Sequence, residues 1–341
     1  MTVCAPRDDR QRQAEPRQAD LSIVIVTWNN EREIADCLQS IRDHAGELRC
    51  EVLVVDNASR DATCRVVRAQ FPEVHLMANA ENRGFPAANN QAFERATGRY
   101  TLILNPDTIL RPGTLAQCVE YLETHPETGA VGCRLIYPDG EIQYDCARRF
   151  PDLLTLFLES FYLHMLFPRV PFLSGTAMRC WDHLDSREVP CLMGAFILVR
   201  TPIVRELGGM NTDVFMFYED MDFCCRIRKA GWKIYYLASA VTVHLHGASK
   251  HGTVSSLAGP TLWIFFRQHR GRTAAALCRG ILLVRAVVRL ALGAVLIAPL
   301  RVLQPQRRTS LVDLASHWKL LKWTLAWDRQ DPGRVPIEVR L

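Results

Sequence analysis

The sequence predicts an α/β fold with a mostly parallel central sheet and helices on both faces. Short runs rich in Val, Ile and Leu alternate with longer stretches whose apolar residues recur at helical spacing, and polar residues follow each run. At 341 residues, 48% of them hydrophobic and 23% charged, the chain is long enough for one large domain plus an appendage. This composition excludes a chain that is disordered throughout.

The N-terminal half supplies the repeating strand and helix units. Residues 1–20 are polar, lack an apolar core and are expected to form a disordered leader. The run at 21–27 is β-branched and almost wholly apolar, as expected for a strand buried on both faces. Further strands are expected at 51–55, 74–77 and 100–104, and helices at about 31–41, 59–71 and 85–96, with Ser59 as the N-cap of the second.

The second half is less regular. Residues 143–190 are aromatic, contain prolines and show little periodicity, so we interpret them as a variable insertion. After it we expect a strand at 191–200, a short helix that begins at Pro202, a helix at 223–230 closed by Gly231, and strands at 233–237 and 241–244. The core domain is thus expected to span 21–260.

Residues 261–341 form a basic and apolar tail. They hold 14 Lys/Arg and 4 Asp/Glu, whereas residues 1–260 hold 27 and 32. Three arginines interrupt the apolar stretch 273–300, and its longest uncharged part has 11 residues, although spanning a bilayer takes about 20. We therefore expect amphipathic helices that lie on a membrane surface, with a buried core helix as the alternative. Because the positive charge sits in an apolar segment, lipid fits better than nucleic acid.

The polar residues that follow the strands are the first candidates for a ligand site. In open α/β sheets, ligands bind beyond the carboxyl ends of the strands. No GxGxxG follows the first strand and no GxxxxGK[ST] is present, so neither a dinucleotide-binding fingerprint nor a P-loop supports the site. The candidates are Thr27, Asn29, Asp56, Asn57, Arg83, Gly84, Asn105 and Asp107.

Acidic residues could supply the chemistry. Asp107, in a turn fixed by Pro106, could hold Mg²⁺ or Mn²⁺ against a diphosphate, although a Pro-Asp turn can be only a turn. Asp56 could accept hydrogen bonds from a nucleobase or ribose, or could simply cap a turn.

A second acidic group lies at the start of an expected helix. Glu219, Asp220 and Asp222 follow two aromatic residues there. They could favour the helix N-terminus without any chemistry, or Asp220 could act as a general base. Arg226, four residues after Asp222, could pair with it. His244 and His246 share one face of an expected strand and could ligate a metal, His244 more readily.

These residues occur in blocks that resemble family 2 glycosyltransferases, and most of all their rhamnosyltransferase-like branch. The resemblance covers about residues 21–270, and six blocks in the right order make it specific. The blocks are Ile-Val-Thr-Trp-Asn-Asn (25–30), Val-Val-Asp-Asn-Ala-Ser-Arg-Asp (54–61), Asn-Arg-Gly-Phe-Pro-Ala-Ala-Asn-Asn (82–90), Leu-Asn-Pro-Asp-Thr (104–108), Met-Gly-Ala-Phe-Ile-Leu-Val-Arg (193–200) and Phe-Tyr-Glu-Asp-Met-Asp-Phe-Cys-Cys-Arg (217–226), with shorter matches at 206–210, 230–232 and 244–249.

The resemblance implies a GT-A fold, a nucleotide-diphosphate sugar donor and inversion at the anomeric carbon. It implies that Asp56 contacts the base or ribose, that Asp107 closes a DxD-type metal motif, that Asp220 is the base, with Glu219 beside it, and that His244 can bind the Mg²⁺ or Mn²⁺. Asn105 stands where that motif has its first acidic residue, so a single carboxylate remains there. The Gln-x-x-Arg-Trp motif of processive synthases is missing, which implies one sugar per encounter.

The expected product is a cell-envelope glycan. Rhamnose is the favoured sugar, and a lipid-linked or polysaccharide acceptor would be positioned by the insertion at 143–190 and by the tail. The protein is expected to be cytoplasmic and to contact the inner face of the membrane peripherally through 273–341. The alternatives are a sugar nucleotidyltransferase and a catalytically degenerate module that binds nucleotide sugars or lipid.

Overall fold

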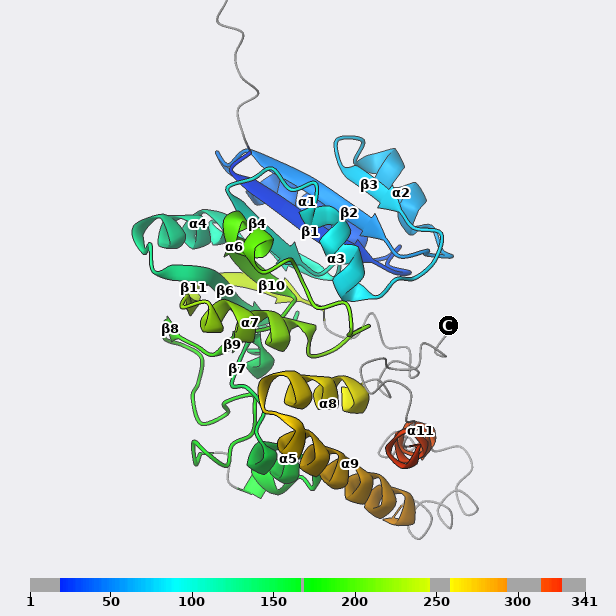
Figure 1. The fold of residues 1–341 in the computed structure, drawn as a ribbon. Helices are drawn as coiled ribbons and strands as arrows, with labels where there is room; N and C mark the ends of the chain where they lie inside the picture. The colour runs from blue at the N-terminus through cyan, green and yellow to red at the C-terminus, as the bar shows by residue number, and fades with distance from the viewer. Residues whose placement is uncertain (1–18, 167–168, 246–257, 293–313, 327–341) are drawn as a thin grey trace, which may run out of the picture.

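The computed structural model describes residues 19–166, 169–245, 258–292 and 314–326, and Figure 1 shows their arrangement. Within these residues the main sheet has nine strands, in the order β3-β2-β1-β4-β10-β6-β11-β5 with β8 paired to β11. The strands are β1 (Leu21–Thr27), β2 (Cys50–Asp56), β3 (His75–Ala78), β4 (Tyr100–Leu104), β5 (Thr108–Leu110), β6 (Thr128–Ile136), β8 (Arg187–Glu188), β10 (Phe196–Arg200) and β11 (Lys233–His244).

The sheet is mostly parallel, as the sequence predicts. β1 runs parallel to β2 and β4, β2 to β3, and β6 to β11. β10 is antiparallel to both of its neighbours, β4 and β6, and therefore begins at the edge of the sheet where those strands end. The carboxyl ends of β1, β2, β4, β6 and β11 consequently lie along one edge, and the loop that leads into β10 joins them there.

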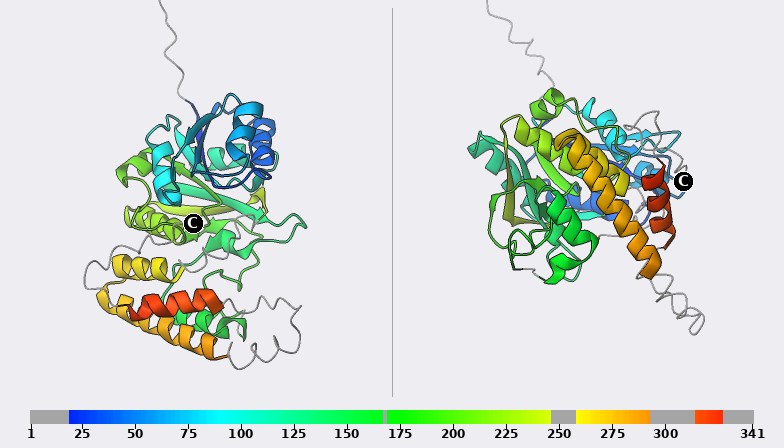
Figure 2. Two further views of the ribbon diagram at one scale, coloured as in Figure 1. Left: turned by 90° about the vertical axis from the view of Figure 1, so that its right-hand side faces the viewer. Right: turned by 60° about the horizontal axis from the view of Figure 1, so that its bottom comes forward.

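Helices cover both faces of the sheet. Those of the core domain are α1 (Ile34–His44), α2 (Thr63–Gln70), α3 (Phe85–Phe93), α4 (Thr114–Thr124), α6 (Thr201–Glu206) and α7 (Glu219–Lys229). Helices α1 and α2 lie on one side of the strands and α3 on the other (Figure 2, left). Asn90 of α3 bonds Met210 beyond α6, and Arg226 of α7 bonds the carbonyls of Leu207 and Gly209, so these three helices form one layer.

Several predicted elements differ from those observed. Strands β1 and β4 have the predicted bounds. The prediction that Ser59 caps a helix is wrong, because α2 begins at Thr63 and the Ser59 hydroxyl instead donates to Asp56. The run at 191–200 is two strands, β9 (Cys191–Leu192) and β10, and the two late strands are one irregular strand, β11.

A helical layer lies beneath the sheet domain in Figure 1. It consists of α5 (Leu153–Ser160), the short η2 (Leu163–Leu166), α8 (Ala258–His269), α9 (Arg272–Leu292) and α11 (Leu314–Leu325). Helix α9 contacts α5, α8 and α11, so the layer combines the middle of the chain with its end. The short η1 (Tyr144–Cys146) and β7 (Ala147–Arg148), which pairs with β9, connect this layer to the sheet.

Helix α9 has a buried side, as expected of a core helix, and an exposed apolar side, as expected of a helix on a membrane surface. Ala275, Cys278, Leu282 and Ala286 are buried on one side, while Leu277, Val284 and Val287 on another side are about half exposed. No helix in the described part of the chain is long and apolar enough to cross a bilayer. The segment 293–313, which includes part of the predicted apolar stretch, lies outside the described residues, as do residues 1–18 of the expected leader and Trp327.

Candidate active site

Asp56 lies at the carboxyl end of β2, within a pocket of hydroxyl groups. Its Oδ1 accepts a hydrogen bond from the Thr27 hydroxyl at 3.0 Å, and its Oδ2 accepts one from the Ser59 amide at 2.9 Å. The side chain is 2% exposed, so these bonds fix its orientation. Thr27 therefore positions Asp56, and together they form the floor of the predicted nucleotide site.

The neighbouring loops hold the other predicted donor-site residues. Asn29 has a positive φ of 57°; its amide donates to the Ser59 hydroxyl and its side chain accepts from the Arg60 amide. Asn57 Nδ2 donates to the Gly84 carbonyl at 3.1 Å, which ties the loop after β2 to the loop before α3. Arg83 projects from the second loop and is partly exposed.

Gly84 has a packing role at this edge. Its φ is +83°, and an added Cβ would lie 2.7 Å from the Phe215 carbonyl oxygen. The Phe85 amide donates to that same carbonyl at 2.9 Å. Only glycine allows the two backbones to approach this closely, so Gly84 sets the distance between the loop that carries Arg83 and the backbone at Phe215.

Asp107 and His244 lie together although 137 residues separate them in the sequence. His244 Nε2 is 3.4 Å from Asp107 Oδ1 and 3.4 Å from Asn105 Nδ2. The side chains are brought together because β5, which follows Asp107 directly, pairs with the end of β11, Thr108 opposite His244. Both are almost completely buried, at 5% and 2% exposure.

Gln143 determines which nitrogen of His244 carries a proton. Its Nε2 donates to the His244 carbonyl at 2.6 Å, which directs its Oε1 toward His244 Nδ1 at 2.8 Å. Because Oε1 can only accept, Nδ1 carries the proton in the neutral imidazole, and Nε2 of that tautomer presents its lone pair. That nitrogen faces the Asp107 carboxylate, and the two atoms together form a suitable pair of ligands for a cation.

The donor set here fits a divalent cation that is shared with a substrate. No three His, Cys, Asp or Glu side chains in the described residues come together as a complete metal site. One carboxylate and one oriented imidazole are nevertheless suitable ligands, because Mg²⁺ and Mn²⁺ often complete their coordination with substrate phosphates and water. His246, the second predicted histidine, lies outside the described residues.

A three-residue segment, 193–195, links Asp220 to Asn105. The Gly194 amide donates to Asp220 Oδ2 at 3.0 Å, and the carbonyl of the next residue, Ala195, accepts from the Asn105 amide at 3.1 Å. This segment precedes β10, the strand that runs antiparallel to both of its neighbours. Asp220 and Asn105 therefore lie on either side of one short peptide stretch.

Asp220 also forms a buried ion pair with Arg148 of β7. Burial would lower the pKa of the Arg148 guanidinium, but the charge of Asp220 and other nearby groups outweighs it, and the pKa is raised. The Met221 amide donates to Asp220 Oδ1 at 2.7 Å. Both carboxylate oxygens are thus directed by fixed donors.

Glu219, adjacent to Asp220, has a contrasting environment. Its Oε2 is buried without a hydrogen-bond partner among the described residues. Burial, reinforced by the charge of Asp220, raises the pKa of Glu219 to about 8. Near neutral pH this side chain is therefore mostly an uncharged acid.

Helix α7 begins after two residues in the left-handed region. Phe217 has φ 70° and Tyr218 has φ 61°. Such conformations are costly for aromatic residues and occur where the surrounding structure enforces them, often at functional sites. They turn the chain so that Glu219 and Asp220 open the helix toward the sheet edge.

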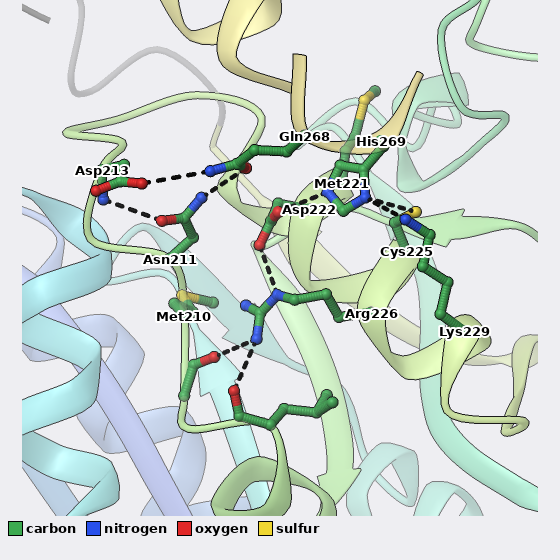
Figure 3. A network of polar contacts seen from close by, with 12 residues as sticks. Met210, Asn211, Asp213, Met221, Asp222, Cys225, Arg226, Lys229, Gln268 and His269 are labelled. Atoms are coloured by element: carbon green, nitrogen blue, oxygen red, sulfur yellow. Dashed lines mark hydrogen bonds and ion pairs between the residues drawn. The ribbon is translucent and has the colours of Figure 1, made fainter. Parts of the chain in front are cut away.

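Asp222, the third carboxylate, has a structural role (Figure 3). Its Oδ2 accepts from Arg226 Nε at 2.8 Å, which confirms the predicted pair, and its Oδ1 lies 2.7 Å from His269 Nε2 of α8. Despite burial, hydrogen bonds from His269 and the charge of Arg226 lower the pKa of Asp222. Asp222 thus fastens α7 to α8.

The sequence interpretation missed two residues of the site, Gln143 and Arg148. Both lie within 143–190, which we expected to be a variable insertion. The available signal was position: residues just beyond a strand of a parallel sheet are ligand-site candidates, and Gln143 follows β6. Strand β6 was not predicted, so Gln143 did not stand out as a residue beyond a strand.

Comparisons with known proteins agree with this arrangement. Residues 22–181 match the model of glycosyl transferase family 2. An N-acetylglucosaminyl-diphospho-decaprenol L-rhamnosyltransferase of Mycobacterium tuberculosis (strain H37Rv) is 31% identical over 245 residues, which are 68% of this chain and 78% of that protein. Rhamnosyltransferase WbbL of Escherichia coli K12 is 25% identical over 230 residues, covering 65% and 82%.

A solved structure shows the same fold. The mannosyltransferase PcManGT from Pyrobaculum calidifontis, in complex with GDP-Man and Mn²⁺, superposes with a TM-score of 0.54 at 20% identity, over 92% of this chain and 89% of that one. The architecture is therefore the GT-A fold of glycosyltransferases.

Proposed function

Because this chain belongs to glycosyltransferase family 2, we propose that it is an inverting enzyme that moves one sugar from a nucleotide-diphosphate donor to an acceptor hydroxyl. The observation that carries the proposal is the segment 193–195, which bonds Asp220 on one side and Asn105 on the other. Asp220, a carboxylate suited to deprotonating the acceptor, is therefore only one short peptide stretch away from the polar residues suited to binding the donor.

The donor is proposed to bind along the carboxyl edge of the sheet. Asp56 and Asn57, held by Thr27 and Gly84, would contact the nucleoside, and Asn29 and Arg83 would flank the path of the diphosphate. Rhamnose is the favoured sugar because two relatives are rhamnosyltransferases. The same relatives favour a role in cell-envelope glycan synthesis, and one acts, by its name, on a lipid-linked acceptor.

Asp220 is proposed to remove the proton from the attacking hydroxyl. Gly194 and Arg148 hold its Oδ2, and Met221 holds its Oδ1, so the carboxylate needs no reorganisation before the reaction. Glu219, uncharged near neutral pH, would assist by keeping a second negative charge away from this base. The hydroxyl then attacks the anomeric carbon opposite the leaving diphosphate.

Asp107 and His244 are proposed to hold a Mg²⁺ or Mn²⁺ together with Asn105 nearby, while Gln143 keeps the His244 lone pair toward it. Such a cation would neutralise charge on the leaving diphosphate. The protein is proposed to work in the cytoplasm, on the inner face of the membrane, with peripheral contact through 273–341. The helices α8, α9 and α11 carry seven Lys/Arg and no Asp or Glu, which favours an anionic lipid surface.

The first experiment measures thermal stability and sugar transfer with dTDP-, UDP- and GDP-linked donors, with Mn²⁺ or with EDTA. We expect a metal-dependent rise in melting temperature with dTDP and transfer from dTDP-rhamnose to a lipid-linked acceptor. A rise with UDP instead would keep the class and change the sugar. Formation of a nucleotide sugar from a sugar phosphate would support the nucleotidyltransferase, and binding without transfer or hydrolysis would support the degenerate module.

The variant Asp220→Asn tests the base. It keeps the shape of the side chain but cannot accept a proton, so we expect turnover to fall by about 10²-fold or more while the affinity for the donor stays within about twofold. Asp213→Asn, an exposed position on the loop before α7, is the matched control. Unchanged turnover in Asp220→Asn would refute the assignment.

A further inference from the structure

Two arginines of α9 face the rest of the helical layer without an ion-paired carboxylate among the described residues. Arg285 and Arg289 are four residues apart and so lie on one side of the helix. In the part of the chain that the structure describes, no carboxylate lies within 4.0 Å of either guanidinium. Burial lowers the pKa of Arg285 and the positive charge of Arg289 lowers it further, while Tyr218, Tyr162 and Glu159 act in the opposite direction. Two like charges at this spacing repel each other, and an anion between them would relieve the repulsion.

Buried polar atoms beside this pair also lack partners among the described residues. Arg285 Nε and the Ser160 hydroxyl are buried without a hydrogen bond, and Ser160 is only 2% exposed. Arg289 Nη2 donates to the Ser160 carbonyl at 3.2 Å, so the serine and this guanidinium are neighbours. Arg289 also lies over the ring of Tyr162, 4.8 Å from its centroid. Unsatisfied buried donors of this kind indicate a missing acceptor.

This cluster interacts electrostatically with Tyr218, the residue directly before α7. Tyr218, which directly precedes Glu219, is partly buried, and burial raises the pKa of its hydroxyl to about 12 while Arg148 and Arg285 both oppose the shift. Tyr218 is therefore within electrostatic reach of both arginines. Arg148 pairs with Asp220, so Tyr218 interacts with one arginine at the proposed base and with another in the cluster, as well as with the carboxylate of Glu159.

The outer side of the cluster is apolar. Helices α5 and α9 lie side by side, and the short η2 follows α5 (Figures 1 and 2). Large side chains from all three are at least 44% exposed, far more than most apolar side chains of the sheet domain; they are Leu154, Phe157, Met165, Leu166, Leu277, Val284, Val287 and Leu292. We call these residues the α5–α9 apolar surface. A cluster of anion-binding groups bordered by such a surface fits an amphiphile with a phosphate head.

We propose that Arg285 and Arg289, with the Ser160 hydroxyl, bind the diphosphate of a lipid-linked acceptor whose hydrocarbon chain lies on the α5–α9 apolar surface. The guanidinium groups supply paired N–H donors that match phosphate oxygens. The sugar end of the acceptor would then point past Tyr218 toward Asp220. The choice of a lipid-linked acceptor rests on the proposed function, whereas the anion site itself rests on the cluster.

A binding measurement tests the site without any sugar transfer. Geranyl diphosphate, a short and soluble isoprenyl diphosphate, is titrated into the full-length protein by calorimetry in EDTA, so that no cation recruits it to the donor site. We expect Arg285→Gln to raise the dissociation constant at least about tenfold, since each charge-assisted contact is strong. Arg272→Gln, an exposed position on the same helix with the same loss of charge, should bind as the wild type does.

Further variants and ligands distinguish a diphosphate site from a general attraction to anionic bilayers. Arg285→Lys should recover part of the affinity, and Ser160→Ala should weaken binding by about threefold, which keeps the test valid if Arg285→Gln folds poorly. Equal affinity in Arg285→Gln and the wild type would overturn the proposal. A second combination of results would also overturn the proposal: equal affinity for geranyl diphosphate and geranyl monophosphate, together with reduced sedimentation of Arg285→Gln on phosphatidylglycerol vesicles. The arginines would then bind an anionic bilayer and not a diphosphate. Binding of the nucleotide-sugar donor, measured in a separate experiment, tests the proposed function, so that failure of one proposal can be told from failure of the other.

Discussion

Two adjacent carboxylates show how the local environment divides roles between residues. Asp220 has three fixed donors, one of them a buried arginine, whereas Glu219 has a buried oxygen with no partner among the described residues. A sequence of consecutive acidic residues does not reveal this difference. It follows from the direction of each side chain at the start of α7, which the left-handed conformations of Phe217 and Tyr218 impose.

The raised pKa of Glu219 predicts a pH-dependent stability. An unfolded glutamate loses its proton near pH 4.5, whereas folded Glu219 keeps it up to about pH 8. Between these values the folded state binds one more proton than the unfolded state, so this residue lowers the free energy of unfolding as the pH rises. Glu219→Gln removes the cost, and we expect its stability relative to the wild type to increase across this window, measured by denaturant unfolding at several pH values.

The control for this prediction is Glu120→Gln, an exposed position on α4. Its stability relative to the wild type should not change across the same window. A constant difference between Glu219→Gln and the wild type would show that Glu219 is ionised in the folded protein, and the uncharged role proposed for it would be wrong.

At the same scale, the sequence predicted some of the site and not the rest. Asp107 and His244 were chosen separately, each because it follows or ends an expected strand, and the structure brings them together. Gln143 and Arg148 act through other residues, one on an imidazole and one on a carboxylate. Their partners lie more than 70 positions away in the sequence, so a local pattern can at most place Gln143 beyond a strand and cannot show what either side chain contacts.

Among the elements, α7 depends on its junction with α8. Asp222 lies between Arg226 of its own helix and His269 of α8, and the side chains of Asp222 and His269 are almost fully buried. The preceding residue of α8, Gln268, makes a separate set of hydrogen bonds with Asn211 and the exposed Asp213 (Figure 3). The position of the proposed base therefore depends on a helix that lies outside the sheet domain.

This junction predicts a loss of stability without a loss of donor binding. Asp222→Asn leaves Arg226 and His269, whose pKa the hydrogen bond to Asp222 raises to about 9, without their carboxylate, and we expect the free energy of unfolding to fall by about 3 kcal/mol. Asp213→Asn, in the separate and exposed set of contacts around Gln268, should change it by less than about 0.5 kcal/mol. Denaturant unfolding and nucleotide affinity measure the two effects. A change below about 1 kcal/mol in Asp222→Asn would mean that the junction does not fix α7.

Sequence patterns predicted the elements well where burial was uniform. Strands β1 and β4 are buried along their whole length, and their apolar runs gave the correct bounds. The run at 191–200 also looked continuous, but Gly194 and Ala195 leave the strand to bond Asp220 and Asn105. Tertiary bonds of this kind override the local pattern, which is why β10 begins only at Phe196.

The whole molecule consists of a sheet domain above a basic helical layer (Figure 1). The exposed apolar side chains of this layer predict binding to anionic membranes. We expect the double variant Leu277→Asp, Val287→Asp to lose most of its co-sedimentation with vesicles that contain phosphatidylglycerol, because both side chains are about half exposed and would carry charge into the interface.

Leu184→Asp is the control, since that side chain is 59% exposed but lies in the segment before β8, outside the layer. It should sediment as the wild type does. Sedimentation of the wild type should also decrease as salt is added, because the basic residues contribute through charge. If the double variant sediments fully, the layer is not a membrane surface.

The contact between Arg289 and Ser160 joins segments that are 129 residues apart in the chain. The surface proposed to bind an acceptor is therefore formed jointly by the middle of the chain and the tail. A chimera designed to change acceptor preference would have to exchange 153–166 and 258–326 as one unit, because either segment alone would meet a foreign partner along the α5–α9 contact. By the same reasoning, relatives with different acceptors should have diverged in these two segments together, while the sheet edge that faces the donor stayed the same.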